Sequence, residues 1–142
     1  MKHIAIAQSD SEIERCLPVM RELRPHLTDD TFVARVRQQE SLGGFNLVYL
    51  EDAGEVKAVA GIPIMENLAW GKFLYVDDLV TAAAERSKGY GDALFDWLVG
   101  YARQQECQQL HLDSGVQRFD AHRFYLRKRM SINCHHFALP LS

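Results

Sequence analysis

Glycine and basic residues crowd one short segment whose chemistry suits a phosphate. The segment Arg86-Ser87-Lys88-Gly89-Tyr90-Gly91 follows an apolar, β-branched run and opens into an amphipathic helix pattern. The first N–H groups of a helix have no partner inside it, and the helix dipole favours negative charge at that end. Glycine keeps side chains away from an approaching anion, while Arg86 and Lys88 add positive charge. The segment therefore predicts a pyrophosphate-binding turn, with an ordinary solvated glycine-rich turn as the alternative.

Two adjacent carboxylates precede this segment and are candidates for proton transfer. Asp77 and Asp78 fall in a predicted central strand, where a buried carboxylate is costly unless it has a partner or a task. Because side chains alternate along a strand, we expect the two to point to opposite faces. One would then line a substrate pocket, and the other would pair with a neighbouring backbone or basic group. The alternative is that both lie at a solvated strand end. Tyr75, Glu66 and His111 remain alternative candidates for the base.

Three motifs in this order resemble the GCN5-related N-acetyltransferase (GNAT) superfamily. Arg86–Gly91 is similar to the acyl-CoA-binding motif Gln/Arg-x-x-Gly-x-Gly/Ala, which follows a strand and begins a helix. Ala121-His122-Arg123-Phe124-Tyr125 is similar to the later helix that carries a Phe-Tyr or Tyr-Tyr pair. The segment 75–80 resembles the acidic strand of members that acetylate small amines. With the elements that flank these motifs, the resemblance spans nearly the whole chain.

The resemblance implies acetyl-CoA as the co-substrate and assigns roles to particular residues. The implied acetyl-CoA-binding residues are Leu79, Val80, Thr81, Arg86, Ser87, Lys88, Gly89, Tyr90 and Gly91. The catalytic roles implied are protonation of the leaving thiolate by Tyr125 and handling of the acceptor amine by Asp77 or Asp78. The alternative for Tyr125 is simple aromatic packing with Phe124 on a core-facing helix. No metal is implied.

The predicted function is transfer of an acetyl group from acetyl-CoA to a primary amine, by direct attack of the amine on the thioester. A small cationic metabolite is the favoured acceptor. Two alternatives stay open: an acyl-CoA-binding regulatory or sensor module without turnover, and an enzyme that acetylates a protein lysine or N-terminus. The sequence names neither the individual acceptor nor the oligomeric state, for which a homodimer is one option.

Composition limits the protein class further. At 142 residues we expect one domain over residues 1–142, with 47% apolar and 25% charged residues as in ordinary globular proteins. A net charge of −3 argues against nucleic acid or an anionic membrane as a partner. The cysteines, Cys16, Cys107 and Cys134, are odd in number and lack metal-ligand spacing. A reducing cytoplasm is therefore the expected location.

Hydrophobic periodicity predicts a mixed strand and helix order. The expected strands cover residues 2–8, 45–50, 56–65, 72–81, 109–112 and 132–139, and the expected helices cover residues 10–23, about 29–42, 89–105 and 119–128. Pro18 predicts a kink or an early end in the first helix, and Pro63 predicts a bulge or strand end. The expected class is α/β (α+β): a mixed, mostly antiparallel central sheet of six to seven strands, with about four helices on both faces.

Overall fold

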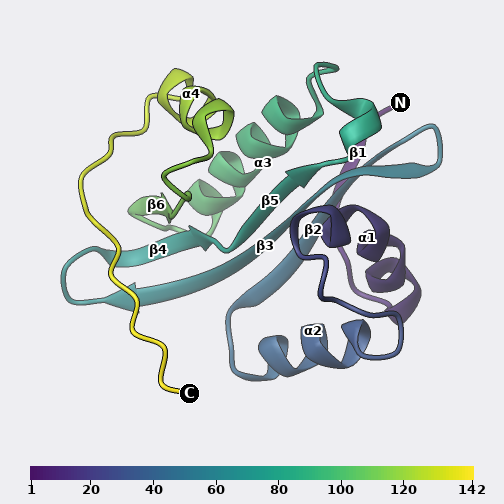
Figure 1. Cartoon of the computed structure of the whole chain (residues 1–142), viewed down its shortest axis with the longest axis horizontal. Coiled ribbons are helices and arrows are strands. Elements are labelled where there is room, and N and C mark those ends of the chain that lie inside the picture. The colour runs from purple at the N-terminus through teal and green to yellow at the C-terminus, as the bar shows by residue number, and fades with distance from the viewer. The chain divides into compact units, whose positions relative to one another are not determined.

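Six strands form one mostly antiparallel sheet in the computed structural model, which describes residues 1–142 (Figure 1). The strands are β1 (His3–Ile6), β2 (Phe45–Asp52), β3 (Glu55–Asn67), β4 (Gly71–Val76), β5 (Asp78–Thr81) and β6 (Gln109–Leu112). The helices are α1 (Asp10–Leu23), α2 (Phe32–Ser41), α3 (Tyr90–Gln104), α4 (Phe119–Arg127) and the single 3-10 turn η1 (Ala83–Glu85). The strand order is β1-β2-β3-β4-β6, and β5 pairs with β3. Residues 1–111 and 112–142 form two compact units.

The helices of the first unit pack against apolar side chains on both faces of the sheet. Alternating residues of β2 point to opposite faces. Leu47 and Tyr49 join a buried cluster with residues of α1 and α2, among them Ile13 and Val36. Val48 and Leu50, which alternate with these residues along β2, are also buried. Helix α3 lies against β2, β3 and β5, and its Leu94 and Leu98 are fully buried. The α/β (α+β) class predicted from the sequence is confirmed, with six strands and four helices.

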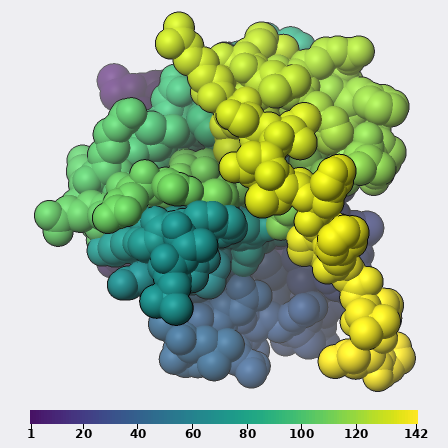
Figure 2. Space-filling view, turned by 90° about the vertical axis from the view of Figure 1, so that its left-hand side faces the viewer, coloured from purple at the N-terminus to yellow at the C-terminus, as the bar shows by residue number.

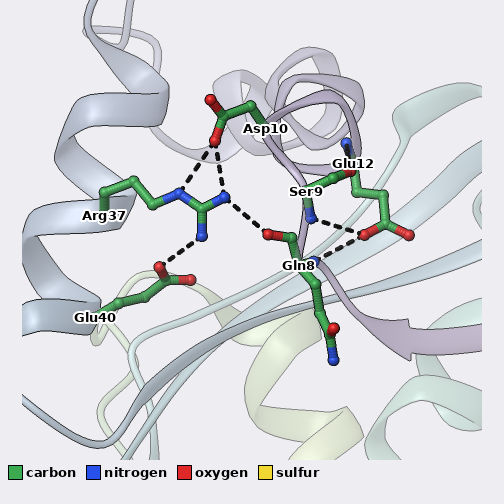
Figure 3. Close-up of polar contacts among 6 residues, drawn as sticks. All are labelled: Gln8, Ser9, Asp10, Glu12, Arg37 and Glu40. Carbon is green, nitrogen blue, oxygen red and sulfur yellow. Dashed lines mark hydrogen bonds and ion pairs between the residues drawn. The ribbon is translucent and has the colours of Figure 1, made fainter.

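A polar cluster ties the start of α1 to α2 (Figure 3). Ser9 caps α1 by accepting the Glu12 N–H, and the Glu12 carboxylate accepts the Ser9 N–H in return. Arg37 of α2 donates to Asp10 at 2.8 and 3.1 Å and to Glu40 at 2.9 Å. The two helices therefore approach β2 as a connected pair.

Neither of the two prolines ends the element in which it lies. α1 continues through Pro18 to Leu23, so the predicted early end is wrong. β3 likewise continues through Pro63, which pairs with Phe45 of β2. The irregularity lies instead on the strand that faces Pro63, as the pairing register shows.

The predicted continuous strand 72–81 is broken into β4 and β5 by one extra residue. β3 pairs Ile64 with Leu74 of β4, and it pairs Gly61 with Asp78 of β5. Three steps along β3 thus face four steps along the other strand, which is a β-bulge. The main-chain groups of even-numbered β3 residues, such as Ile64, hydrogen-bond toward β2, so those of odd-numbered residues point toward β4. Pro63 is one of these, and it has no N–H to donate to β4.

The predicted last strand, 132–139, is wrong. Residues 128–142 contain no helix or strand, and the residues after 130 run as an extended chain, yellow in Figure 2. α4 ends at Arg127, close to the prediction, and Arg129 just after it has a left-handed φ of 69°. None of the helices has the length and apolar character needed to cross a lipid bilayer.

Candidate active site

The turn between η1 and α3 presents backbone N–H groups at an uncapped helix start. Gly89 is the N-cap of α3 with φ +83°, and no side chain caps this end. Ser87 is also left-handed, with φ +69°. The Ala93 N–H is the one that bonds back to the Gly89 carbonyl, so the N–H groups just before it are left for an outside acceptor. A Cβ built on Gly89 meets nothing within 4 Å, so open space adjoins the turn.

Of the two basic residues of this turn, Lys88 is in an ion pair and Arg86 is not. Lys88 donates to Glu85 at 2.7 Å, and this contact raises the pKa of Lys88 and lowers the pKa of Glu85. Arg86 is exposed and has no ion-pair partner. Arg86 is therefore the cation of this turn that is available to an incoming anion, while Lys88 also shapes the turn.

A buried lysine fixes the turn to the sheet. Lys57 of β3 is 9% exposed and pairs with Glu85 and Glu55, each at 3.0 Å. The hydrogen bonds that Lys57 donates, first the one to Glu85 and then the one to Glu55, raise the pKa of Lys57. Glu22 of α1 accepts the Ala83 N–H at 2.8 Å and so fixes the other end of η1. The turn is held from β3 and from α1 before any ligand arrives.

Tyr90 anchors the start of α3 with its side chain. The ring is buried, and the hydroxyl donates to Asp52 at the end of β2 at 2.8 Å. The N-terminal ammonium of Met1 also pairs with Asp52, at 2.9 Å. The Tyr90 side chain is therefore committed to the fold, and only its main chain can serve a ligand at the turn.

β5 has one free edge, and the register shows which residues face it. β5 pairs with β3 alone. The Ala82 N–H bonds to the Lys57 carbonyl, so Val80 and Asp78, at the same parity, also face β3. The main-chain groups of Leu79 and Thr81 point to the free edge. Of the three strand residues predicted to bind acetyl-CoA, Val80 thus has its main chain committed to the sheet.

The bulge separates the roles of the two adjacent carboxylates. Asp78 is largely shielded, and its Oδ1 accepts from Arg24 Nε at 2.8 Å. Arg24 Nη2 also donates to the Asp77 carbonyl at 3.1 Å. The Asp77 side chain is exposed, contrary to the expected burial. The main-chain N–H of Asp77 donates to the Gly61 carbonyl. Because the bulge interrupts the ladder, the expected strict alternation of their faces does not apply here.

The pKa of Asp77 is raised from 3.8 to about 6. Desolvation is the largest cause, the negative charge of Asp78 adds to it, and Arg24 opposes it. A carboxylate of this kind is mostly ionised at neutral pH, yet it is basic enough to take a proton from a reacting group. Among the candidate acids and bases, Asp77 combines solvent access with a pKa suited to proton transfer.

Tyr125, the candidate acid, and the alternative candidate bases lie in different surroundings. Tyr125 is in α4 of the second unit, half-buried, and burial raises its pKa while Arg118 partly lowers it. The phenol therefore stays protonated at neutral pH. His111 stacks on Trp70 with ring centroids 3.5 Å apart, and burial lowers its pKa. Tyr75 lies in β4 and Glu66 lies on the exposed part of β3.

Three supporting residues escaped the sequence prediction. Arg24 is 54 residues from Asp78 in the chain, and Glu22 is 61 residues from Ala83, so no local pattern signals either contact. Lys57 carried a signal, because it interrupts the apolar run of β3 and a buried lysine needs a partner.

Replacing each aspartate by asparagine should change stability in opposite directions. Between about pH 4 and 6 native Asp77 holds a proton that the unfolded chain has lost, so its contribution becomes unfavourable as pH rises. Asp77→Asn should therefore raise the free energy of unfolding at pH 7.5 by about 1 kcal/mol or less, because solvent screens an exposed charge. At pH 4 the gain should vanish. Asp78→Asn should destabilise at pH 7.5 by leaving Arg24 without its ion pair.

Urea unfolding of both variants and of the unchanged protein at the two pH values measures this. A stabilising Asp78→Asn, or a gain for Asp77→Asn that grows toward pH 4, would contradict the assignment of the two carboxylates.

Comparisons with known proteins agree with this architecture. The Acetyltransferase (GNAT) family matches residues 10–130. The chain is 35% identical over 128 residues to the uncharacterized N-acetyltransferase YhdJ of Bacillus subtilis (strain 168), covering 90% of each chain. It is 34% identical over 91 residues to glucosamine 6-phosphate N-acetyltransferase 1 of Oryza sativa subsp. japonica, covering 61% of this chain and 55% of the other.

A solved structure shares the fold at low sequence identity. It is AAC(6')-Iy in complex with the bisubstrate analogue CoA-S-monomethyl-acetylneamine, with a TM-score of 0.87, 10% identity, and coverage of 100% of this chain and 99% of that one. The family match over most of the chain and the YhdJ relative together show that this protein belongs to the GNAT family of N-acetyltransferases.

Proposed function

We propose that this N-acetyltransferase moves an acetyl group from acetyl-CoA to the primary amine of a small metabolite by direct attack. One observation carries the proposal. Residues 77–91 present in order an exposed carboxylate with a pKa of about 6, a strand with a free main-chain edge, and an uncapped helix start. These are the groups needed to accept a proton, to hold an extended thioester arm and to bind a pyrophosphate.

The turn at residues 86–91 binds the pyrophosphate in this proposal. Its main-chain N–H groups point out of a helix end, where anions are favoured, and Arg86 supplies a positive charge without a competing partner. The open space beside Gly89 fits the close approach of a phosphate. The contacts through Lys57 and Glu22 mean that little ordering of the turn is needed on binding.

The free edge of β5 holds the pantetheine arm. Leu79 and Thr81 offer N–H and C=O groups there, and an extended arm can bond to them much as another strand would. A fixed N–H next to the thioester oxygen becomes a stronger partner as negative charge develops on that oxygen. Leu79, beside the bulge, is the residue that we assign to this task.

The transfer balances with two side chains. Asp77 accepts a proton from the ammonium group of the acceptor, directly or through water. The free amine attacks the thioester carbonyl carbon and the C–N bond forms. The attacking nitrogen then loses its second proton to solvent, and the C–S bond breaks as the amide forms. Tyr125 donates its hydroxyl proton to the departing thiolate and is later reprotonated from solvent. No covalent acyl-enzyme is required.

Small-molecule acceptors are favoured by the acidic bulge and by one relative. A carboxylate beside the free edge of β5 attracts an ammonium group without needing an extended peptide groove. The acceptor named for the rice relative is also a small amine, glucosamine 6-phosphate. Thiol release from acetyl-CoA across a panel of amines tests the proposal, and a protein that binds acetyl-CoA but releases thiol with none of them would be a non-catalytic acyl-CoA-binding module.

Gly89→Val should weaken acetyl-CoA binding about ten- to a hundred-fold, because it fills the space beside the turn and strains a residue at φ +83°. Gly43→Val is the matched control. Gly43 has φ +102° and open space around it, but it lies between α2 and β2. Calorimetry with acetyl-CoA compares the two variants, and equal affinity in both would remove the turn from the binding site.

Asp77→Asn should lower kcat with an amine at pH 7.5 by about 10²–10⁴-fold, the range expected for loss of a general base. In the unchanged protein, activity should fall as pH drops below about 6, where Asp77 takes up its proton. The variant should lose that descending limb while its affinity for acetyl-CoA persists. An unchanged pH profile in a folded Asp77→Asn protein would shift the role of base to Tyr75, Glu66 or His111.

Tyr125→Phe keeps the ring and deletes one hydroxyl. We expect kcat to fall by about 10²–10⁴-fold with little change in acetyl-CoA affinity, since the hydroxyl acts on the leaving sulfur. Single-turnover kinetics ensure that the chemical step is observed. Full single-turnover activity in the variant would exclude Tyr125 as the acid.

A further inference from the structure

A pocket of about 300 Å³ adjoins the bulge on the side covered by α1 and α2. Its wall includes Asp78 of β5, and its apolar part comes from residues such as Met20, Phe32 and Phe45. Arg24, His26 and Arg35 also line it. The pocket therefore combines apolar walls with two arginines and the carboxylate of Asp78, which follows Asp77 in the chain.

The charges in this pocket do not cancel. Asp78 is the one carboxylate of the lining, and Arg24 is committed to it through the 2.8 Å ion pair. Arg35, exposed on α2, has no ion-pair partner. The positive charge of Arg35 thus remains uncompensated in the pocket.

An anionic group is the ligand that this arrangement favours. A guanidinium donates two parallel N–H bonds to a carboxylate or phosphate, a geometry that other side chains do not supply. Apolar walls lower the local dielectric constant, which strengthens the attraction for an anion and the repulsion of a second cation. A purely cationic amine, such as a polyamine, would place further positive charge against Arg35.

We infer that the acceptor is an amine that also carries an oxyanion, either a carboxylate or a phosphate, and that Arg35 binds this oxyanion while the amine lies toward Asp77. The inference rests on the proposed function and narrows its substrate class. The Arg24–Asp78 pair links the pocket to the bulge, because both residues line the pocket and Arg24 also contacts the Asp77 carbonyl. Amine and anion would then meet opposite charges in one site.

Matched amine pairs test this, each pair differing in the oxyanion. Suitable pairs are ethanolamine and O-phosphoethanolamine, propylamine and β-alanine, and glucosamine and glucosamine 6-phosphate. Acetyl transfer is followed by thiol release at pH 7.5, and binding of each amine is measured by calorimetry in the presence of CoA. We expect kcat/KM to favour the anionic member of at least one pair by about ten- to a hundred-fold, as a hydrogen bond between charged groups would give. The preferred pair separates phosphate from carboxylate.

Substitutions of Arg35 connect the preference to the pocket. Arg35→Gln should reduce the preference by about the same factor, mainly through KM, and Arg35→Lys should retain part of it because the charge remains. Arg103→Gln, which removes an exposed arginine near the end of α3, is the control and should leave the preference unchanged. Because Arg35 is exposed and unpaired, the variants should fold normally.

The outcomes separate the two proposals. Acetylation of both members of every pair with equal efficiency, or a preference that Arg35→Gln does not alter, overturns the anionic subsite and leaves the proposed function standing. Arg35-dependent binding of the anionic amines without any thiol release supports the subsite and overturns the proposed function. Neither binding nor turnover of any amine overturns both.

Discussion

One extra residue opposite β3 is the constraint on which the candidate site depends. Pro63 has no N–H to offer β4, and at this point the pairing register shifts by one residue between Leu74 and Asp78. Before the bulge, β4 lies between β3 and β6 in the sheet. After the bulge, β5 pairs with β3 alone. The bulge thus lies where the strand paired with β6 gives way to β5 with its free edge, and Asp77 is exposed at the same point.

β3 supports every part of this arrangement. Its Gly61 carbonyl accepts the Asp77 N–H at the bulge, and its Lys57 carbonyl accepts the Ala82 N–H at the end of β5. The Lys57 side chain then holds Glu85, and so the turn before α3. Removing Glu85 alone would leave a nearly buried ammonium group with one exposed partner, which is more costly than the pair is stabilising. The carboxylate, the edge and the turn are therefore positioned by one strand and move little relative to one another.

The sequence predicted those features whose causes are local. α3 and its glycine turn were predicted almost to the residue, because helix periodicity and a glycine at a left-handed N-cap are signals within a few residues. The bulge was placed at Pro63 rather than on the strand facing it, since the effect of a missing donor appears in the partner. The strand 132–139 was wrong because alternating apolar residues form a strand only where a partner completes the ladder.

The different surroundings of Asp77 and Asp78 show why sequence alone could not choose between the two carboxylates. Identical side chains one residue apart acquire different chemistry from their surroundings, as in other sites where two carboxylates have separate roles. Arg24, brought in from 54 residues away, keeps Asp78 occupied in an ion pair. The charge that remains on Asp78 is also one of the causes that raise the pKa of Asp77. Structural and chemical tasks are therefore coupled: the carboxylate that fixes the end of α1 also makes its neighbour a better proton acceptor. A substitution at Asp78 would change the basicity of Asp77 even though it touches no reacting atom.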